Sequence, residues 1–409
     1  MSKNPLQSQF LFPTVALVSL VIGSYYLRIS TFSVQPSAIP VFPKDRLPFP
    51  TANHSQLPAS HVTDHMTDHM IQEDVFGQWK AVKLKEVDKP VDKAKKEPSK
   101  YAVISSSTPR NLSNVNDYNY AFDLPLTVVS WQRLGFKSIV LLTGSTDVWV
   151  EHSILGLIHS YLKDLGAKIV FIEGNDKNKV MLSQTSRLFA ACLSDLDLDD
   201  YIITSDSDLW PINGEKFVLP KNKELLSTYA ECCSDFRHKG EKFRMLPLSS
   251  IGATVKTWRD IMFNDNNSTC SFDAIKNSSN ILSYFAKEFG KIVFEPVSKG
   301  VNDGWYLDQH MASIRIEQWI RRRNDTSMLE FATRDIKRDR LDRSRWHPRN
   351  LRSLTDTHLL TSLYKTGAWL KLQPVLTAMY GKGSTFFTLC QRYRQEFVAE
   401  VQAKLKVLL

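Results

Sequence analysis

The segment YIITSDSDLW at positions 201–210 joins a short apolar run to the acidic pair Asp206 and Asp208. The run 201–205 is rich in aromatic and β-branched residues, which predicts a buried strand. Side chains two positions apart in an extended segment lie on the same face, so both carboxylates can contact one hard cation or one ribose. The segment therefore predicts a strand that ends in a polar binding site.

The residues that precede this segment alternate between strand and helix patterns. Gly135 and Gly166 follow two of the helical patterns as C-terminal stops. In chain order the predicted elements are strand 101–104, helix 124–134, strand 138–142, helix 154–165, strand 168–172, helix 182–196 and strand 201–205. This order predicts an α/β fold with a parallel sheet, helices on both faces and ligands at the carboxyl ends of the strands.

The spacing of the two aspartates is less informative than their position. Two other D-x-D triplets, 195–197 and 197–199, fall in a polar helix-to-strand connection, where solvated loop acids are expected. Only Asp206 and Asp208 directly follow an apolar strand in the βα series. An acidic turn that closes the strand is the alternative interpretation, but the position favours a binding site.

Composition limits the class of protein without deciding it. The chain has 409 residues, 43% hydrophobic and 23% charged, a balance typical of a globular protein. Its formal charge of +9 is compatible with nucleic acid, an anionic membrane or an acidic substrate. Five cysteines are too few for a disulfide-built scaffold, although one or two disulfides are plausible. Cys192 lies on the apolar face of helix 182–196 and is expected to be a buried free thiol.

The N-terminus indicates the compartment. Residues 1–9 form a short tail, and residues 10–27 are uncharged and long enough to cross a bilayer as a signal anchor; a cleaved signal peptide is the alternative. Residues 28–100 have the proline-rich and lysine-rich composition of a disordered stem. Six N-x-S/T triplets support a luminal body, and they begin at Asn53, Asn111, Asn266, Asn267, Asn277 and Asn324. This order predicts a single-pass type II Golgi membrane enzyme, and a luminal body argues against nucleic acid as a partner.

Residues 101 to about 360 resemble glycosyltransferases of the GT-A fold, in which a D-x-D motif binds Mn²⁺ or Mg²⁺ and a nucleotide sugar. The resemblance implies a catalytic domain over 101–409, with a Rossmann-like nucleotide-sugar-binding sheet and a mixed C-terminal acceptor half. It also implies transfer of a sugar, with a UDP-sugar as the expected donor, to a glycan, glycoprotein or glycolipid acceptor. Asp206 would then contact the metal or the ribose, and Asp208 the metal.

Further site residues are carried over from the same resemblance. The first strand and its loop, 101–108, would hold the nucleobase, and the stretches 248–253 and 303–309 resemble the segments where donor sugar and acceptor meet. The implied donor-binding residues are Tyr101, Ser105, Arg187, Asp206, Gly252 and Trp305. Asp308 would deprotonate the acceptor if the enzyme inverts. If it retains, Asp308 would hold the donor sugar and Gln309 would lie beneath the anomeric carbon.

Two histidines are candidates to complete the metal shell, His358 in the segment TDTH and His347 in RWH. The spacing of Asp356 and His358 resembles the D-x-H ligand pair of some retaining families. The chain also has 11 Arg and one Lys between Arg315 and Arg352. One or two of these could neutralise a diphosphate, whereas most are expected on a solvated surface.

Two other functions remain possible from the sequence. A non-catalytic luminal protein that keeps this fold and binds glycans would be expected to lose the acidic pair, which is present here. A nucleotidyltransferase shares the architecture but would carry a glycine-rich loop after the first strand, and 105–110 contains no glycine. The residues after Thr361 have helical spacing and are expected to pack on the body.

Overall fold

The computed structural model describes residues 97–230, 234–264, 270, 275–297, 303–333, 335–347 and 350–406. The chain divides into two units, Met1–Asp88 and Lys89–Leu409. The first unit, with the predicted tail and the predicted anchor at 10–27, lies outside the described residues. Within the described ranges, no helix combines the length and the apolar character needed to cross a membrane.

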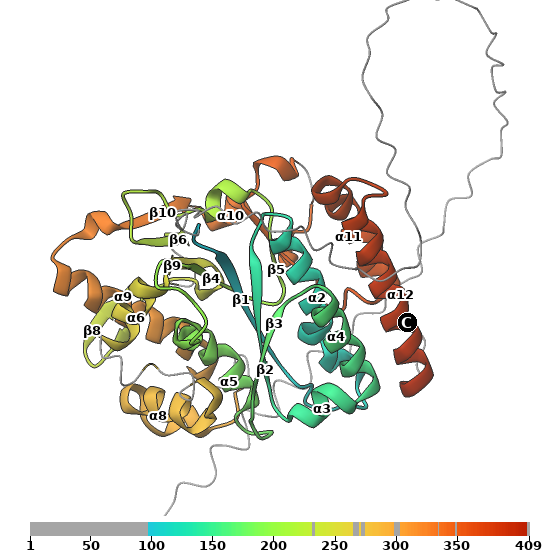
Figure 1. Cartoon of the computed structure of the whole chain (residues 1–409), viewed down its shortest axis with the longest axis horizontal. Coiled ribbons are helices and arrows are strands. Elements are labelled where there is room, and N and C mark those ends of the chain that lie inside the picture. The colour runs from blue at the N-terminus through green and yellow to red at the C-terminus, as the bar shows by residue number, and fades with distance from the viewer. Residues whose placement is uncertain are drawn as a thin grey trace, which may run out of the picture. The chain divides into compact units, whose positions relative to one another are not determined.

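A seven-stranded sheet forms the centre of the second unit, with the strand order β10-β6-β9-β4-β1-β2-β3 (Figure 1). The strands are β1 Lys100–Ser107, β2 Lys137–Thr143, β3 Lys168–Ile172, β4 Tyr201–Ser205, β6 Leu225–Tyr229, β9 Ile251–Thr254 and β10 Leu329–Thr333. Only β9 runs antiparallel to its neighbours β4 and β6. The chain is therefore a mixed α/β protein with a mostly parallel central sheet, compatible with a Rossmann-like fold.

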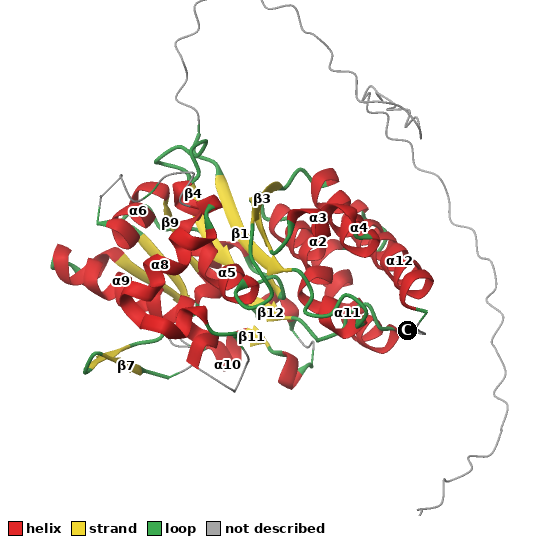
Figure 2. Ribbon diagram, turned by 90° about the horizontal axis from the view of Figure 1, so that it is seen from below, coloured by secondary structure: helices red, strands yellow, loops and turns green. Residues whose placement is uncertain are grey.

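Helices cover both faces of this sheet (Figure 2). One face carries α2 Asn119–Gln132, α3 Thr146–Glu151, α4 Ser153–Asp164, α11 Thr366–Tyr380 and α12 Thr385–Leu405. The other carries α5 Lys179–Thr185, the 3₁₀ helix η2 Ser186–Cys192, α6 Val255–Phe263, α8 Ser278–Phe289 and α9 Leu307–Arg323. Along β1, Ala102 and Ile104 enter the first core and Val103 the second, the alternation of a strand buried on both faces. The predicted packing of the C-terminal helices on the body is confirmed.

The predicted helix 182–196 is shorter and changes type. It begins at Lys179, and after Thr185 the chain continues as η2. The hydroxyls of Ser183 and Thr185 donate to the carbonyl oxygens of Val180 and Met181, at 2.8 Å each. Such bonds compete with the regular backbone pattern and bend helices.

The expectation of a free thiol at Cys192 is wrong, because Cys192 forms a disulfide with Cys270. The apolar spacing around Cys192 indicated its burial correctly, with 2% of its surface exposed. It carried no information about a partner that lies 78 residues away in the sequence. Cys390 is buried and free.

The segment that follows Asp208 belongs to a second, smaller sheet. Strand β5 Leu209–Pro211 pairs antiparallel with β12 Asp356–His358, which pairs in parallel with β11 Arg340–Leu341. In this register His358 lies opposite Leu209. The backbone N–H of Leu359 also donates to the carbonyl oxygen of Asp208 at 2.8 Å. Two segments distant in sequence thus meet at the end of β4.

The remaining elements are short. They are the hairpin strands β7 Phe236–His238 and β8 Glu241–Phe243, the helix α10 Ile336–Asp339, and 3₁₀ helices that include η1 Val115–Tyr118, η4 Leu248–Ser250, η6 Asp303–Tyr306 and η8 Arg343–Arg345. Several of them supply walls of the cavity described next.

Candidate functional site

A cavity of about 450 Å³ lies at the carboxyl ends of β1 and β4. From β1 the chain continues to β2 and β3 on one side of the sheet, and β4 lies on the other side. This reversal of strand order leaves a crevice between the two strand ends, the usual ligand position in such sheets. Residues 105–107 are the last residues of β1 and residues 206–208 follow β4, and both groups line the cavity.

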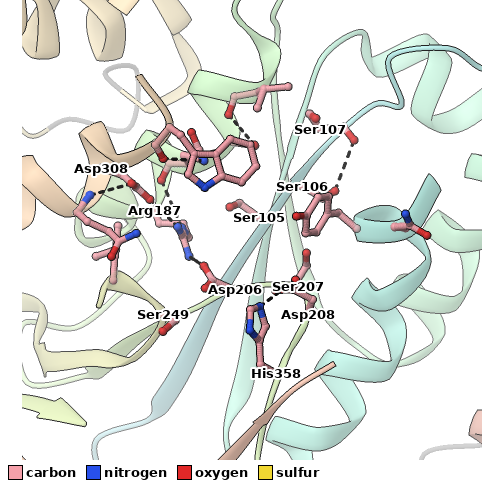
Figure 3. Close-up of a pocket in the computed structure, with 18 of the residues that line it drawn as sticks. Ser105, Ser106, Ser107, Arg187, Asp206, Ser207, Asp208, Ser249, Asp308 and His358 are labelled. Carbon is pink, nitrogen blue, oxygen red and sulfur yellow. Dashed lines mark hydrogen bonds and ion pairs between the residues drawn. The ribbon is translucent and has the colours of Figure 1, made fainter. Parts of the chain in front are cut away.

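The structure brings most of the residues expected at the site to this one cavity (Figure 3). Those that line it are Ser105, Arg187, Asp206, Asp208, Trp305, Asp308, Gln309 and His358. The exposed acids of the other two D-x-D triplets lie in the connection before β4, as the sequence predicted.

Three of the expected residues are not brought there. Tyr101 lies near the start of β1, because the strand extends to Ser107 and its carboxyl end is therefore farther along the chain than predicted. Gly252 packs against Tyr201, whose Oη would stand 1.9 Å from a Cβ at that position, so close packing explains the glycine. His347 is exposed and does not line the cavity. The sequence-based assignments of Tyr101 and Gly252 to the donor and of His347 to the metal thus have no support from the geometry.

Arg187 connects two of the cavity carboxylates. Its guanidinium donates through Nη1 to Asp206 Oδ1 at 2.5 Å and through Nη2 to Asp308 Oδ2 at 2.7 Å (Figure 3). Burial raises the pKa of Asp308 above its ordinary value, although the positive charge of Arg187 acts in the opposite direction. Asp308 stands in the first turn of α9, so the bridge ties the end of β4 to the start of that helix.

Asp208 lies in a second charged cluster with Arg343 and His358. The Arg343 guanidinium contacts Asp208 Oδ2, and His358 Nε2 lies 3.4 Å from the same oxygen. Burial by itself would raise the pKa of Asp208, but His358 and Arg343 outweigh it and hold the pKa well below its ordinary range. Burial lowers the pKa of His358, but Asp208 and Asp342 outweigh that effect and raise it to about 9.

The side chains of Asp208 and His358 fit a divalent cation. Carboxylate oxygen and imidazole nitrogen are both donors that Mn²⁺ accepts. On the far side of the ring, His358 Nδ1 lies 3.2 Å from Asp342 Oδ2, the outer carboxylate that commonly orients a metal-binding histidine and leaves Nε2 for the metal. The described residues contain no group of three or more His, Cys, Asp or Glu side chains able to hold an ion. A cation between Asp208 and His358 would therefore take its other ligands from a bound phosphate and water.

Two arginines from the basic stretch 315–352 line the cavity, Arg340 and Arg343. Arg340 forms a two-pronged pair with Asp356, at 2.7 and 2.8 Å. Asp356 also accepts from the Tyr229 hydroxyl at 2.7 Å and is completely buried. Both carboxylate oxygens of Asp356 are thus engaged by Arg340 and Tyr229, whereas His358 Nε2 faces Asp208.

Two cavity residues carry acceptors that are buried without a partner. Within the described part of the chain, the Oε1 atoms of Gln184 and Gln309 have no hydrogen-bond donor. A buried acceptor without a donor costs free energy, which a ligand hydroxyl would recover. Sequence reasoning missed Gln184, although it stands three positions before Arg187 and so on the same side of the chain.

The opposite wall comes from η1 and the start of α2. Tyr120 lines the cavity and is 44% exposed, so part of its ring is open to a ligand. Asn116, Asp117 and Asn119 add polar side chains beside it. None of these residues follows a predicted strand, and no sequence pattern connected them with the acidic pair.

Comparison with known proteins does not identify the chain. No protein-family model matches the sequence, and no curated protein is significantly similar to it. One solved structure that it resembles is 4-diphosphocytidyl-2C-methyl-D-erythritol synthase from Anaerococcus prevotii. The match has 13% sequence identity, covers 52% of this chain and 96% of that protein, and has a TM-score of 0.26. This similarity is too low to assign a family or an activity.

Proposed function

We propose that the protein is a metal-dependent glycosyltransferase of the GT-A fold, which transfers a sugar from a nucleotide sugar, a UDP-sugar, to a glycan, glycoprotein or glycolipid acceptor. One observation carries the proposal. Asp206 and Asp208 leave the end of β4 at the switch point of the sheet, in one cavity with His358, Arg340 and Arg343.

The walls of the cavity suggest how a nucleotide sugar would lie. The hydroxyls of 105–107 and the open ring of Tyr120 offer hydrogen bonds and a stacking face to the nucleoside. Arg343 contacts Asp208 and Arg340 lines the same cavity, so a diphosphate bound there would meet positive charge. Gln184 and Gln309 offer free acceptors to the hydroxyls of the sugar.

Sugar transfer develops negative charge on the departing diphosphate. A divalent cation held by Asp208 and His358 would stabilise that charge, and Mn²⁺ or Mg²⁺ suits these ligands. Arginines that line the cavity add to this stabilisation. The site thus has a basic side for the leaving group and an amide-rich side for the sugar.

Asp308 has two possible roles, which depend on the stereochemical outcome. Each of its oxygens accepts one hydrogen bond, from Arg187 and from the backbone N–H of Gln309, and each retains a second lone pair. In an inverting enzyme Asp308 would accept the acceptor's proton, which its raised pKa favours. In a retaining enzyme Asp308 and Gln309 would bind the donor sugar.

We also propose a Golgi location, with residues 10–27 as a type II anchor, 28–100 as a stem and 101–409 as the luminal catalytic domain. The disulfide Cys192–Cys270 supports an oxidising compartment. The glycosylation triplets at Asn111, Asn277 and Asn324 are exposed, as glycan attachment requires.

Turnover of nucleotide sugars by the full-length protein in detergent tests this function. Nucleotide release from a panel of UDP- and GDP-sugars would be measured with Mn²⁺, Mg²⁺ or EDTA. We expect metal-dependent release that is lost in Asp208→Ala and kept in Asp195→Ala, a matched change in another D-x-D triplet.

Two results would overturn the proposal. No turnover, together with no rise in melting temperature on addition of any nucleotide and Mn²⁺, would favour a non-catalytic glycan-binding or accessory protein. Pyrophosphate release from a nucleoside triphosphate and a sugar phosphate would indicate a nucleotidyltransferase.

A further inference from the structure

Arg343 occupies the position that a cation would take. Its Nη2 contacts both Asp208 Oδ2 and His358 Nε2. These are the two atoms that face each other at 3.4 Å and that fit a divalent ion. A guanidinium and a metal ion cannot both occupy this space, so one must leave when the other enters.

Hydrogen bonds fix the backbone turn that contains Arg343 more firmly than they fix its side chain. Arg343 begins η8, where Asp342 Oδ1 accepts from the backbone N–H of Ser344 at 2.9 Å and from its hydroxyl at 2.6 Å. Asp342 Oδ2 faces His358, so this turn is fixed to the ring. The Arg343 guanidinium can therefore leave Asp208 by a rotation of its side chain, without movement of this turn.

Two other arginines that line the cavity, Arg187 and Arg340, are bound more completely. The Arg187 side chain is 5% exposed and donates to both Asp206 and Asp308. The Arg340 side chain is 9% exposed and donates two hydrogen bonds to Asp356. The Arg343 side chain is 25% exposed, and in the described ranges its Nε has no hydrogen-bond partner although it is buried. Of these three, Arg343 is the most exposed and the one with a buried unpaired nitrogen, so it is the least completely held.

We propose that the Arg343 guanidinium substitutes for the metal ion in the donor-free protein and is displaced when the ion and a nucleoside diphosphate enter together. This inference rests on the proposed function. The diphosphate supplies new acceptors for the displaced guanidinium, so Arg343 moves from a carboxylate to a phosphate. Metal alone offers it no such partner.

A coupling between metal and nucleotide follows from this exchange. Without nucleotide, the metal must displace Arg343 and leave it without its carboxylate. The apparent affinity for the metal is then reduced to its intrinsic value multiplied by the small fraction of molecules in which Arg343 has left the site. With nucleotide, the displaced side chain is again paired. Each ligand therefore strengthens the binding of the other.

Binding of Mn²⁺, measured by the electron paramagnetic resonance signal of the free ion, tests the inference without any turnover. The full-length protein would be compared with Arg343→Gln and with Arg345→Gln, a change in the same 3₁₀ turn at an exposed side chain outside the cavity. Without nucleotide, we expect Arg343→Gln to bind Mn²⁺ about tenfold more tightly than the other two proteins. With UDP present, Mn²⁺ affinity should rise more in the wild type than in Arg343→Gln.

The possible results separate the two proposals. Equal Mn²⁺ affinity of wild type and Arg343→Gln without nucleotide, with UDP-dependent binding intact, would overturn the exchange and leave the proposed function standing. No Mn²⁺ binding by any of the three proteins, even with UDP, would overturn the metal site and the exchange with it. A thermal melt of each protein checks that the variants are folded.

Discussion

Arg187 and Asp308 form an ion pair of 2.7 Å in which the two side chains are only 5% and 3% exposed. The pair joins η2 to the start of α9, and through Asp206 it also reaches the end of β4. The bridge therefore connects three elements that line the cavity.

Replacing Arg187 by Met should therefore destabilise the protein strongly. The change leaves Asp308 buried without its counter-charge, so we expect a loss of about 3–5 kcal/mol in the free energy of unfolding. The exposed Arg321, paired with Glu241 and Glu317, provides the control, because exposed ion pairs contribute little and Arg321→Met should change the free energy of unfolding far less. Urea unfolding measures both, and equal effects would show that the buried bridge does not stabilise the fold.

The cluster around His358 should make stability depend on pH. The pKa of His358 is raised from 6.5 to about 9, so between these values the folded protein holds a proton that the unfolded chain has lost. This contribution to stability is complete below pH 6.5 and disappears as the pH rises through about 9.

The comparison with His358→Gln isolates this effect. The stability difference between wild type and His358→Gln, without metal or nucleotide, should shrink over that interval. His347→Gln, at an exposed histidine, should follow the wild-type curve. A difference that stays constant with pH would contradict the assigned protonation.

The unpartnered amide oxygen of Gln309 should contribute to binding of the sugar and not of the nucleotide. Gln309→Met removes the free Oε1 acceptor from the cavity, so we expect the affinity for the UDP-sugar to fall about tenfold while the affinity for UDP is unchanged. Gln318→Met, on the same helix but outside the cavity, is the control. Calorimetry with both ligands measures the change, and an equal loss for UDP would place Gln309 at the nucleotide instead.

The disulfide should contribute substantially to stability. Cys192–Cys270 closes a loop with a sequence separation of 78 residues, and its removal in Cys270→Ser should cost about 2–5 kcal/mol. Reduction of the wild type should have the same effect, and reduction of the variant should add little. Unfolding curves in the presence and absence of reductant test this, and identical oxidised and reduced wild-type curves would contradict it.

Local sequence patterns predicted the four strands β1 to β4. Strands β3 and β4 have the predicted bounds, because their signal is a short apolar run flanked by turn residues. The position of Asp206 and Asp208 followed from that assignment. Tyr101 was misplaced because β1 is longer than its apolar part and ends in three serines, which resemble a loop.

The contacts across the site were not predictable in the same way. His358 reaches Asp208 through the pairing of β12 with β5, three-residue strands with almost no periodic signal. Arg343 was one of many basic residues in its stretch, and only the tertiary structure separates it from the exposed ones. A disulfide partner likewise has no local signature.

The most direct test of the central claim, that this cavity binds a metal and a nucleoside diphosphate, is calorimetric titration of UDP, GDP and CDP with and without Mn²⁺. We expect one of the nucleotides, UDP first, to bind in a Mn²⁺-dependent way to the wild type and to Asp195→Asn, but not to a folded Asp208→Asn variant. Binding of the nucleotide by Asp208→Asn as tight as that of the wild type, or no binding of any nucleotide by any protein, would contradict it.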